Sequence, residues 1–67
     1  MEYVCNFLNH NSSYVGPSLT IDRASLESAI EEALERLAAY PEYHGFDLLE
    51  EGERRYRFKR ALWADEL

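Results

Sequence analysis

The sequence predicts an α+β domain in two layers, with one amphipathic helix packed on an antiparallel sheet of three or four strands, in the order β(β)αββ. Apolar residues recur at helical spacing through residues 22–40. Residues 2–8 are rich in apolar and aromatic types, and apolar and polar residues alternate on both sides of a glycine turn in residues 46–60. The 67 residues suffice for one small domain, and an apolar content of 46% favours folding over disorder.

Two segments before the helix are candidate strands. Residues 2–8 (EYVCNFL) are rich in apolar and aromatic types, as is typical of a strand covered on both faces. The NHNSS stretch that follows is typical of a turn or loop. Residues 14–21 contain Gly16 and Pro17, and proline cannot donate to a ladder. This segment is therefore either an edge strand or a loop with a short strand at residues 19–21.

Residues 22–40 are expected to form the helix. Asp22 or Ser25 can cap its start by accepting hydrogen bonds from backbone N–H groups, and Pro41 cannot continue it. The apolar residues at helical spacing are Leu26, Ala29, Ile30, Ala33, Leu34 and Leu37. The side chains expected in the core are Leu26, Ile30, Leu34 and Leu37 from the helix, packed against Phe46, Leu48, Tyr56 and Phe58 from the sheet.

The FDLLEEGERRYRFKR stretch is expected to form a β-hairpin, with the EEG residues as a tight loop whose glycine can adopt a positive φ. The face opposite the apolar residues carries Asp47, Leu49, Arg55, Arg57 and Lys59. There the Asp47 carboxylate can pair across the strands with Arg57 or Lys59. The chain beyond the hairpin is expected to cover an open end of the core with Leu62 and Trp63.

Composition weighs against several kinds of function. Cys5 is the one cysteine, so no internal disulfide can form, and we expect it to be buried in a strand. Cysteine and the two histidines lack CxxC or HExxH spacing, so neither a metal nor a cofactor is expected, and an enzyme is the least favoured class. The chain contains no apolar run suited to a signal peptide or membrane span, which predicts a cytoplasmic location. A net charge of −6 argues against direct binding to nucleic acid or an anionic membrane.

Charge is distributed unevenly along the chain. Residues 26–53 hold nine acidic residues and one base, Arg36, whereas residues 54–60 hold five bases and no acid. On the helix, like charges four residues apart cost about 0.2–0.5 kcal/mol per pair, so an uncompensated acidic row suggests a functional reason. The residues expected to contact a partner are Glu27, Glu31, Glu32, Glu35, Asp47, Glu50, Glu51 and Glu53.

This acidic row could imitate a nucleic-acid backbone. Carboxylates on successive helical turns rise by about 6 Å, close to two phosphate steps of about 3.4 Å each. With its SLESAIEEAL helix (residues 25–34) and its hairpin turned by EEGE (residues 50–53), the chain resembles the small acidic phage-encoded anti-CRISPR proteins that act as DNA mimics. The likeness covers residues 19–60 in layout and charge, and the basic residues 54–60 depart from a pure mimic, which leaves mimicry by one face.

The resemblance implies a non-enzymatic, stoichiometric inhibitor acting in the cytoplasm of a bacterial host. Its protein partner would be a CRISPR-type effector with a basic nucleic-acid-binding groove, which the acidic face would occupy.

Two alternatives remain open from the sequence. The chain could be a small self-associating module with a structural or antitoxin-like role, in which the acidic helix of one copy meets the basic strand of the next or two sheet edges pair. It could also bind single-stranded nucleic acid directly through Arg55, Arg57 and Lys59 on the basic strand 54–60. A monomer or a weak homodimer is compatible with the first reading.

Overall fold

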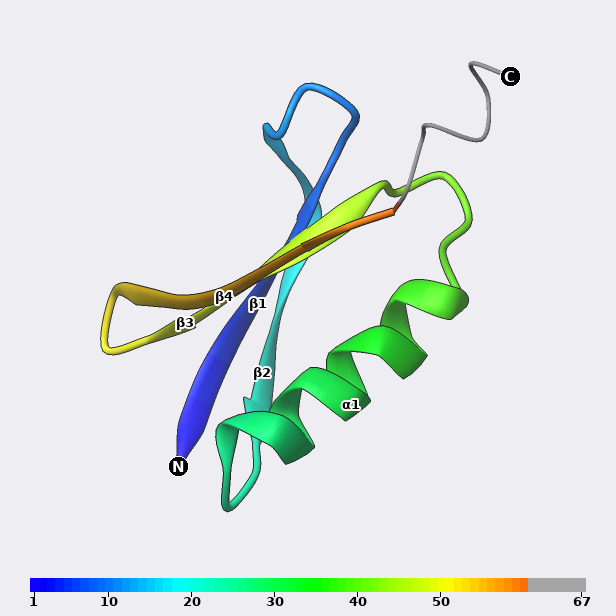
Figure 1. Ribbon diagram of the computed structural model, residues 1–67. Helices are drawn as coiled ribbons and strands as arrows, with labels where there is room; N and C mark the ends of the chain where they lie inside the picture. Colours follow the sequence, from blue (N-terminus) through cyan, green and yellow to red (C-terminus); the bar gives the residue numbers. More distant parts are fainter. Residues whose placement is uncertain (61–67) are drawn as a thin grey trace.

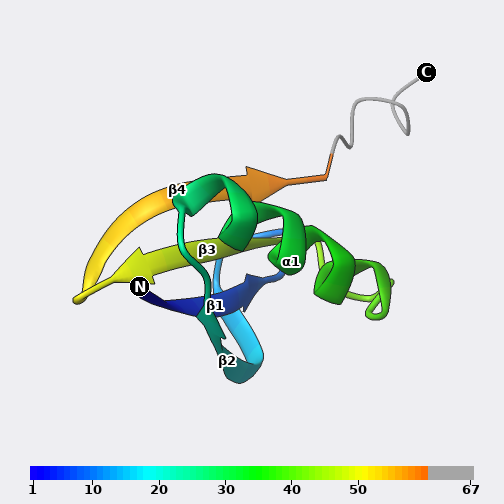
Figure 2. The same cartoon turned by 90° about the horizontal axis from the view of Figure 1, so that it is seen from below.

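The structure, a computed structural model, describes residues 1–60. Its elements are β1 (Glu2–Leu8), β2 (Tyr14–Asp22), α1 (Leu26–Ala38), β3 (Gly45–Glu50) and β4 (Glu53–Lys59). The strands form one antiparallel sheet in the order β2-β1-β3-β4, and α1 crosses one of its faces (Figures 1 and 2). The predicted α+β class and two-layer order are confirmed as ββαββ. The predicted covering role of Leu62 and Trp63 lies outside the described residues.

Strand β2 runs the full length of the sheet edge, so of the two predictions for this segment the edge strand is confirmed and the short strand is wrong. The register with β1 passes from Asn6 opposite Ser18 to Phe7 opposite Val15. Gly16 and Pro17 fall in the bulge between these pairs, where the proline's missing donor does not interrupt the ladder.

The helix is shorter than the sequence predicts, because its start is set by Ser25 and not by Asp22. The Ser25 side chain accepts from the backbone N–H of Ser28 at 3.2 Å, and the first helical residue is Leu26. At the other end, Ala39 is the cap. The helix therefore spans 13 residues, about 20 Å along its axis.

The buried face of α1 is centred on small residues. Ala29, Ala33 and Leu37 are buried, whereas Leu26 and Ile30 are partly buried against the core. The prediction that Leu34 belongs to the core is wrong, since it is 38% exposed. At 3.6 residues per turn Leu34 lies about a quarter turn from the centre of this buried face, and the alanines let the helix approach the sheet closely.

Arg60 directly follows β4, and its side chain binds the C-terminal end of α1. Its Nε donates to the carbonyl oxygen of Tyr43 at 2.8 Å. Its Nη2 donates to the carbonyl oxygens of Leu37 at 3.0 Å and Tyr40 at 3.5 Å. A guanidinium at a helix C-terminus adds charged hydrogen bonds to the last carbonyls and complements the negative end of the helix dipole. Sequence reading placed Arg60 in the basic segment and did not foresee this role.

The predicted β3–β4 hairpin is confirmed. Phe46 lies opposite Phe58 and Leu48 opposite Tyr56, all on the side of the sheet that faces α1. The turn residues Glu51 and Gly52 have φ values of 53° and 82°, as a two-residue type I′ turn requires. A bulge at Leu48/Leu49 sets Arg54, not Arg55, opposite Leu49.

Gly45 is required by the close approach of two strands. A Cβ atom on Gly45 would meet the backbone carbonyl oxygen of Phe58, which cannot move without opening the β3–β4 ladder. We therefore expect Gly45→Ala to lower the free energy of unfolding by about 2–3 kcal/mol in urea denaturation. The control is Gly52→Ala. A Cβ atom on Gly52 would meet no atom within 4 Å outside the adjacent residues, so this variant should lose only the about 1 kcal/mol that a left-handed backbone costs a non-glycine residue. Equal losses in the two variants would contradict this packing.

Candidate functional site

The outer face of α1 carries a row of three glutamates spaced four residues apart. Glu27, Glu31 and Glu35 are exposed, and within residues 1–60 none of them forms an ion pair. Four residues rise about 6 Å, so the row extends over about 12 Å of helix. We name these three residues the acidic row.

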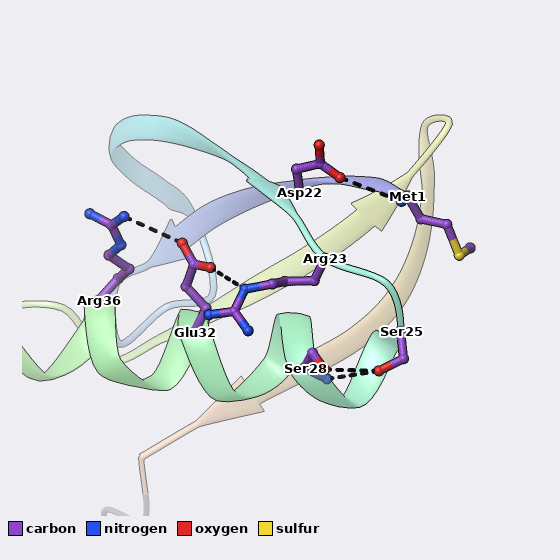
Figure 3. A network of polar contacts seen from close by, with 7 residues as sticks. All are labelled: Met1, Asp22, Arg23, Ser25, Ser28, Glu32 and Arg36. Carbon is purple, nitrogen blue, oxygen red and sulfur yellow. Dashed lines mark hydrogen bonds and ion pairs between the residues drawn. The ribbon is translucent and has the colours of Figure 1, made fainter.

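Glu32, one helical position away, is neutralised. Its carboxylate accepts from Arg23 Nε at 2.7 Å and from Arg36 Nη2 at 3.3 Å (Figure 3). These contacts, led by the Arg23 hydrogen bond, hold the pKa of Glu32 below its usual value. The same figure shows the Met1 ammonium beside Asp22, 3.4 Å away. Arg23 and Arg36 both pair with Glu32, and neither forms an ion pair with the acidic row.

Asp47 lies on the face of the sheet that α1 does not cover, yet its side chain is fully buried. Arg57 binds it with two hydrogen bonds, Nε to Oδ1 at 2.6 Å and Nη2 to Oδ2 at 2.9 Å. The Tyr14 hydroxyl donates to Oδ2 at 2.8 Å. Burial alone would raise the pKa of Asp47, but the hydrogen bonds from Arg57 and Tyr14 and the nearby positive charge outweigh it, so the pKa lies below its usual value. The predicted pairing with Arg57 is confirmed, and its burial removes Asp47 from the set of surface carboxylates.

Three glutamates, Glu50, Glu51 and Glu53, lie at the turn that joins β3 to β4. Glu50 is paired with Arg55 at 2.7 Å, whereas Glu51 and Glu53 are exposed. Together these four residues line a shallow surface depression. Two of the three predicted turn carboxylates are therefore free to meet a partner, and the third is shared with an arginine.

Most cations of β4 already have partners within the molecule. Besides the Arg55 and Arg57 ion pairs, Lys59 Nζ donates to Ser12 Oγ at 2.6 Å. The aromatic side chains Tyr56 and Phe58 point to the α1 side and are partly buried there, on the face opposite Arg57 and Lys59. Stacking groups and cations are thus separated by the sheet, which weighs against binding of a single strand by this segment.

The nucleophilic and metal-ligating residue types are not assembled into a reactive site in the described part of the chain. Cys5 is buried in the core, and burial, with a contribution from the Asp47 charge, raises its pKa to about 12. The rings of His10 and His44 lie 5.7 Å apart, a pairing that the sequence did not reveal because 33 residues separate them. Among residues 1–60 no group of three or more His, Cys, Asp or Glu could hold a metal ion.

Within residues 1–60 no helix is both long and apolar enough to span a bilayer. Comparison of the chain with protein-family models, with curated proteins and with solved structures finds no match.

The Asp47 contacts make stability depend on pH. Because the pKa of Asp47 is lower in the folded chain, its contribution is present above the unfolded-state pKa and is lost as the pH falls. We expect the free energy of unfolding to decrease from about pH 5 to about pH 2, and the Asp47→Asn variant to show a smaller decrease.

At neutral pH, Asp47→Asn should cost about 2 kcal/mol, because it replaces charged hydrogen bonds to Arg57. Glu32→Gln is the control at a more exposed pair and should cost less. Urea denaturation across this pH range measures both effects, and an undiminished pH dependence in Asp47→Asn would show that another group is responsible.

Proposed function

We propose that this protein is a non-enzymatic inhibitor that binds the basic nucleic-acid-binding surface of a bacterial defence effector of the CRISPR type. The observation that carries the proposal is the acidic row, three exposed glutamates on successive turns without an ion pair in residues 1–60. The proposed contact residues are Glu27, Glu31, Glu32, Glu35, Glu50, Glu51 and Glu53. Asp47 is left out because it is buried.

The distribution of intramolecular ion pairs supports this assignment. Arg23 and Arg36 neutralise Glu32, while Arg55 and Arg57 neutralise Glu50 and Asp47. What remains on the outer face of α1 is uncompensated negative charge, and each like-charge pair at this spacing costs the free protein about 0.2–0.5 kcal/mol. A basic groove would convert this repulsion into attraction.

The proposed inhibition is competitive binding and forms no covalent bond. A rigid helix presents carboxylates at a rise of about 6 Å, against about 3.4 Å for successive phosphates of one DNA strand. Arginine and lysine side chains that normally bind alternate phosphates could then bind the acidic row, so protein and DNA compete for one surface. Association driven by such charge is fast and weakens as salt is added.

Self-association through the acidic helix and the basic strand is the alternative. It is less well supported, because Arg55 and Arg57 are engaged with acids of their own chain. Sedimentation at tens of micromolar tests this alternative, since a strict monomer at that concentration excludes it.

Charge reversal in the acidic row tests the proposed function. In Glu31→Lys, Glu35→Lys, displacement of DNA from a purified CRISPR effector should weaken at least about tenfold, because two attractive contacts become repulsive. A panel of such effectors is screened first with the wild-type chain at low and high salt, and the readout is the mobility shift of the effector-bound DNA.

The matched control is Asp22→Lys, Glu42→Lys, which changes the net charge equally at exposed positions outside the proposed contact residues. It should retain most of the inhibition. Equal loss in both double variants would mean that net charge alone matters, and failure of the wild type against every effector would contradict the proposed partner.

A further inference from the structure

Strand β2 presents outward-pointing backbone groups along one margin of the sheet. The N–H of Arg23, directly after β2, donates to the carbonyl oxygen of Met1 at 3.0 Å and so points toward the β1 side. Backbone groups alternate in direction along an antiparallel strand, so the N–H and C=O groups of Ser18, Thr20 and Asp22 point away from β1. Within residues 1–60 no strand lies beyond them.

This margin is regular and open over residues 18–22, which we name the β2 edge. Its pairing with β1 is continuous, and the bulge at residues 16–17 lies before it. On the opposite margin, β4 keeps a continuous register only over residues 56–59. The outward-pointing residues of the β2 edge are all exposed, and Figure 3 shows Asp22 pointing away from α1. The β2 edge is therefore the longer edge that is open to strand addition.

The β2 edge is complementary to itself in its backbone groups. When two copies pair antiparallel about a two-fold axis at Thr20, the groups of Thr20 meet their own counterparts and those of Ser18 meet Asp22. With the axis at Leu19 only Ser18 and Thr20 pair within the edge, and with the axis at Ile21 only Thr20 and Asp22 pair. The axis at Thr20 uses every outward-pointing group of the edge.

The same register is favourable for the side chains on both faces. On the open face, threonine lies opposite threonine and the neutral Ser18 lies opposite Asp22, so no like charges meet. The Asp22 carboxylate has the ammonium group of its own chain 3.4 Å away. On the α1 face, the half-buried Leu19 lies opposite Ile21. Cross-strand pairs of threonine or of apolar residues contribute about 0.2–1 kcal/mol each.

We propose that the β2 edge binds the β2 edge of a second copy of this chain, which joins the two four-stranded sheets into one. The bulge at residues 16–17 ends the pairing, and the two-fold register closes the assembly as a dimer. The dimer is weak, because a short strand pair buries much less than the about 1,600 Å² of a standard interface. None of the proposed inhibitor contact residues lies on β2, so this inference does not depend on the proposed function.

Concentration dependence tests the dimer directly. The full chain is studied from about 20 µM to about 1 mM by sedimentation and by amide hydrogen exchange. The sedimenting mass should rise toward that of a dimer, and the amides of Ser18, Thr20 and Asp22 should become protected. The amides of Leu19 and Ile21 already point toward β1 and should not change. A strict monomer over the whole range, or protection confined to β4, would overturn the proposal.

Charge substitution at the exposed Thr20 tests the register. Thr20→Glu and Thr20→Lys each set like charges opposite each other across the axis and should weaken dimerisation about fivefold at low salt, whereas the neutral control Thr20→Gln should not. An equimolar mixture of the glutamate and lysine variants should recover dimerisation, because opposite charges then face each other. Circular dichroism confirms that each variant folds. Dimerisation that is unchanged in Thr20→Glu, or that does not recover on mixing, would contradict this register.

Discussion

The buried carboxylate of Asp47 is the constraint on which the open side of the sheet depends. It lies on β3 with its neighbour Asn6 opposite it on β1, and it joins Tyr14 of β2 to Arg57 of β4. A buried charge is tolerated only when it is paired and hydrogen-bonded. These three side chains therefore fix one another across all four strands, on a face that no helix covers.

The same interaction shapes the surface charge of the molecule. Arg57 is paired with Asp47 and Arg55 with Glu50, while Arg60 binds carbonyl oxygens at the end of α1. Bases that look free in the sequence are thus largely engaged inside the fold. Within residues 1–60 the three glutamates of the acidic row form no ion pair, so the outer face of α1 carries uncompensated negative charge. This asymmetry is the physical basis for proposing a basic partner.

Local patterns sufficed to predict β1, the helix and the hairpin, because periods of 2 and 3.6 residues report directly on which side chains share a face, but they left β2 open between an edge strand and a loop with a short strand. The burial of Asp47, the exposure of Leu34 and the role of Arg60 could not be predicted in this way. Each depends on how distant segments meet: Tyr14 reaches Asp47 across 33 residues, and Arg60 reaches Leu37 across 23. Of the candidate contact residues, the helix pattern was sufficient to identify the acidic row and the pairing of Glu32 with Arg36 four residues on, whereas the Arg23 partner of Glu32 and the Arg55 partner of Glu50 required the fold.

The most direct measurement of the central claim, that the acidic row is uncompensated in the free protein, is the stability of Glu31→Gln. This change removes the repulsion of Glu31 with both Glu27 and Glu35, so urea denaturation at low salt should give an increase of about 0.5 kcal/mol in the free energy of unfolding, shrinking as salt is added. A decrease in stability at low salt would contradict the claim, because it would mean that the Glu31 carboxylate already has a stabilising partner within the chain.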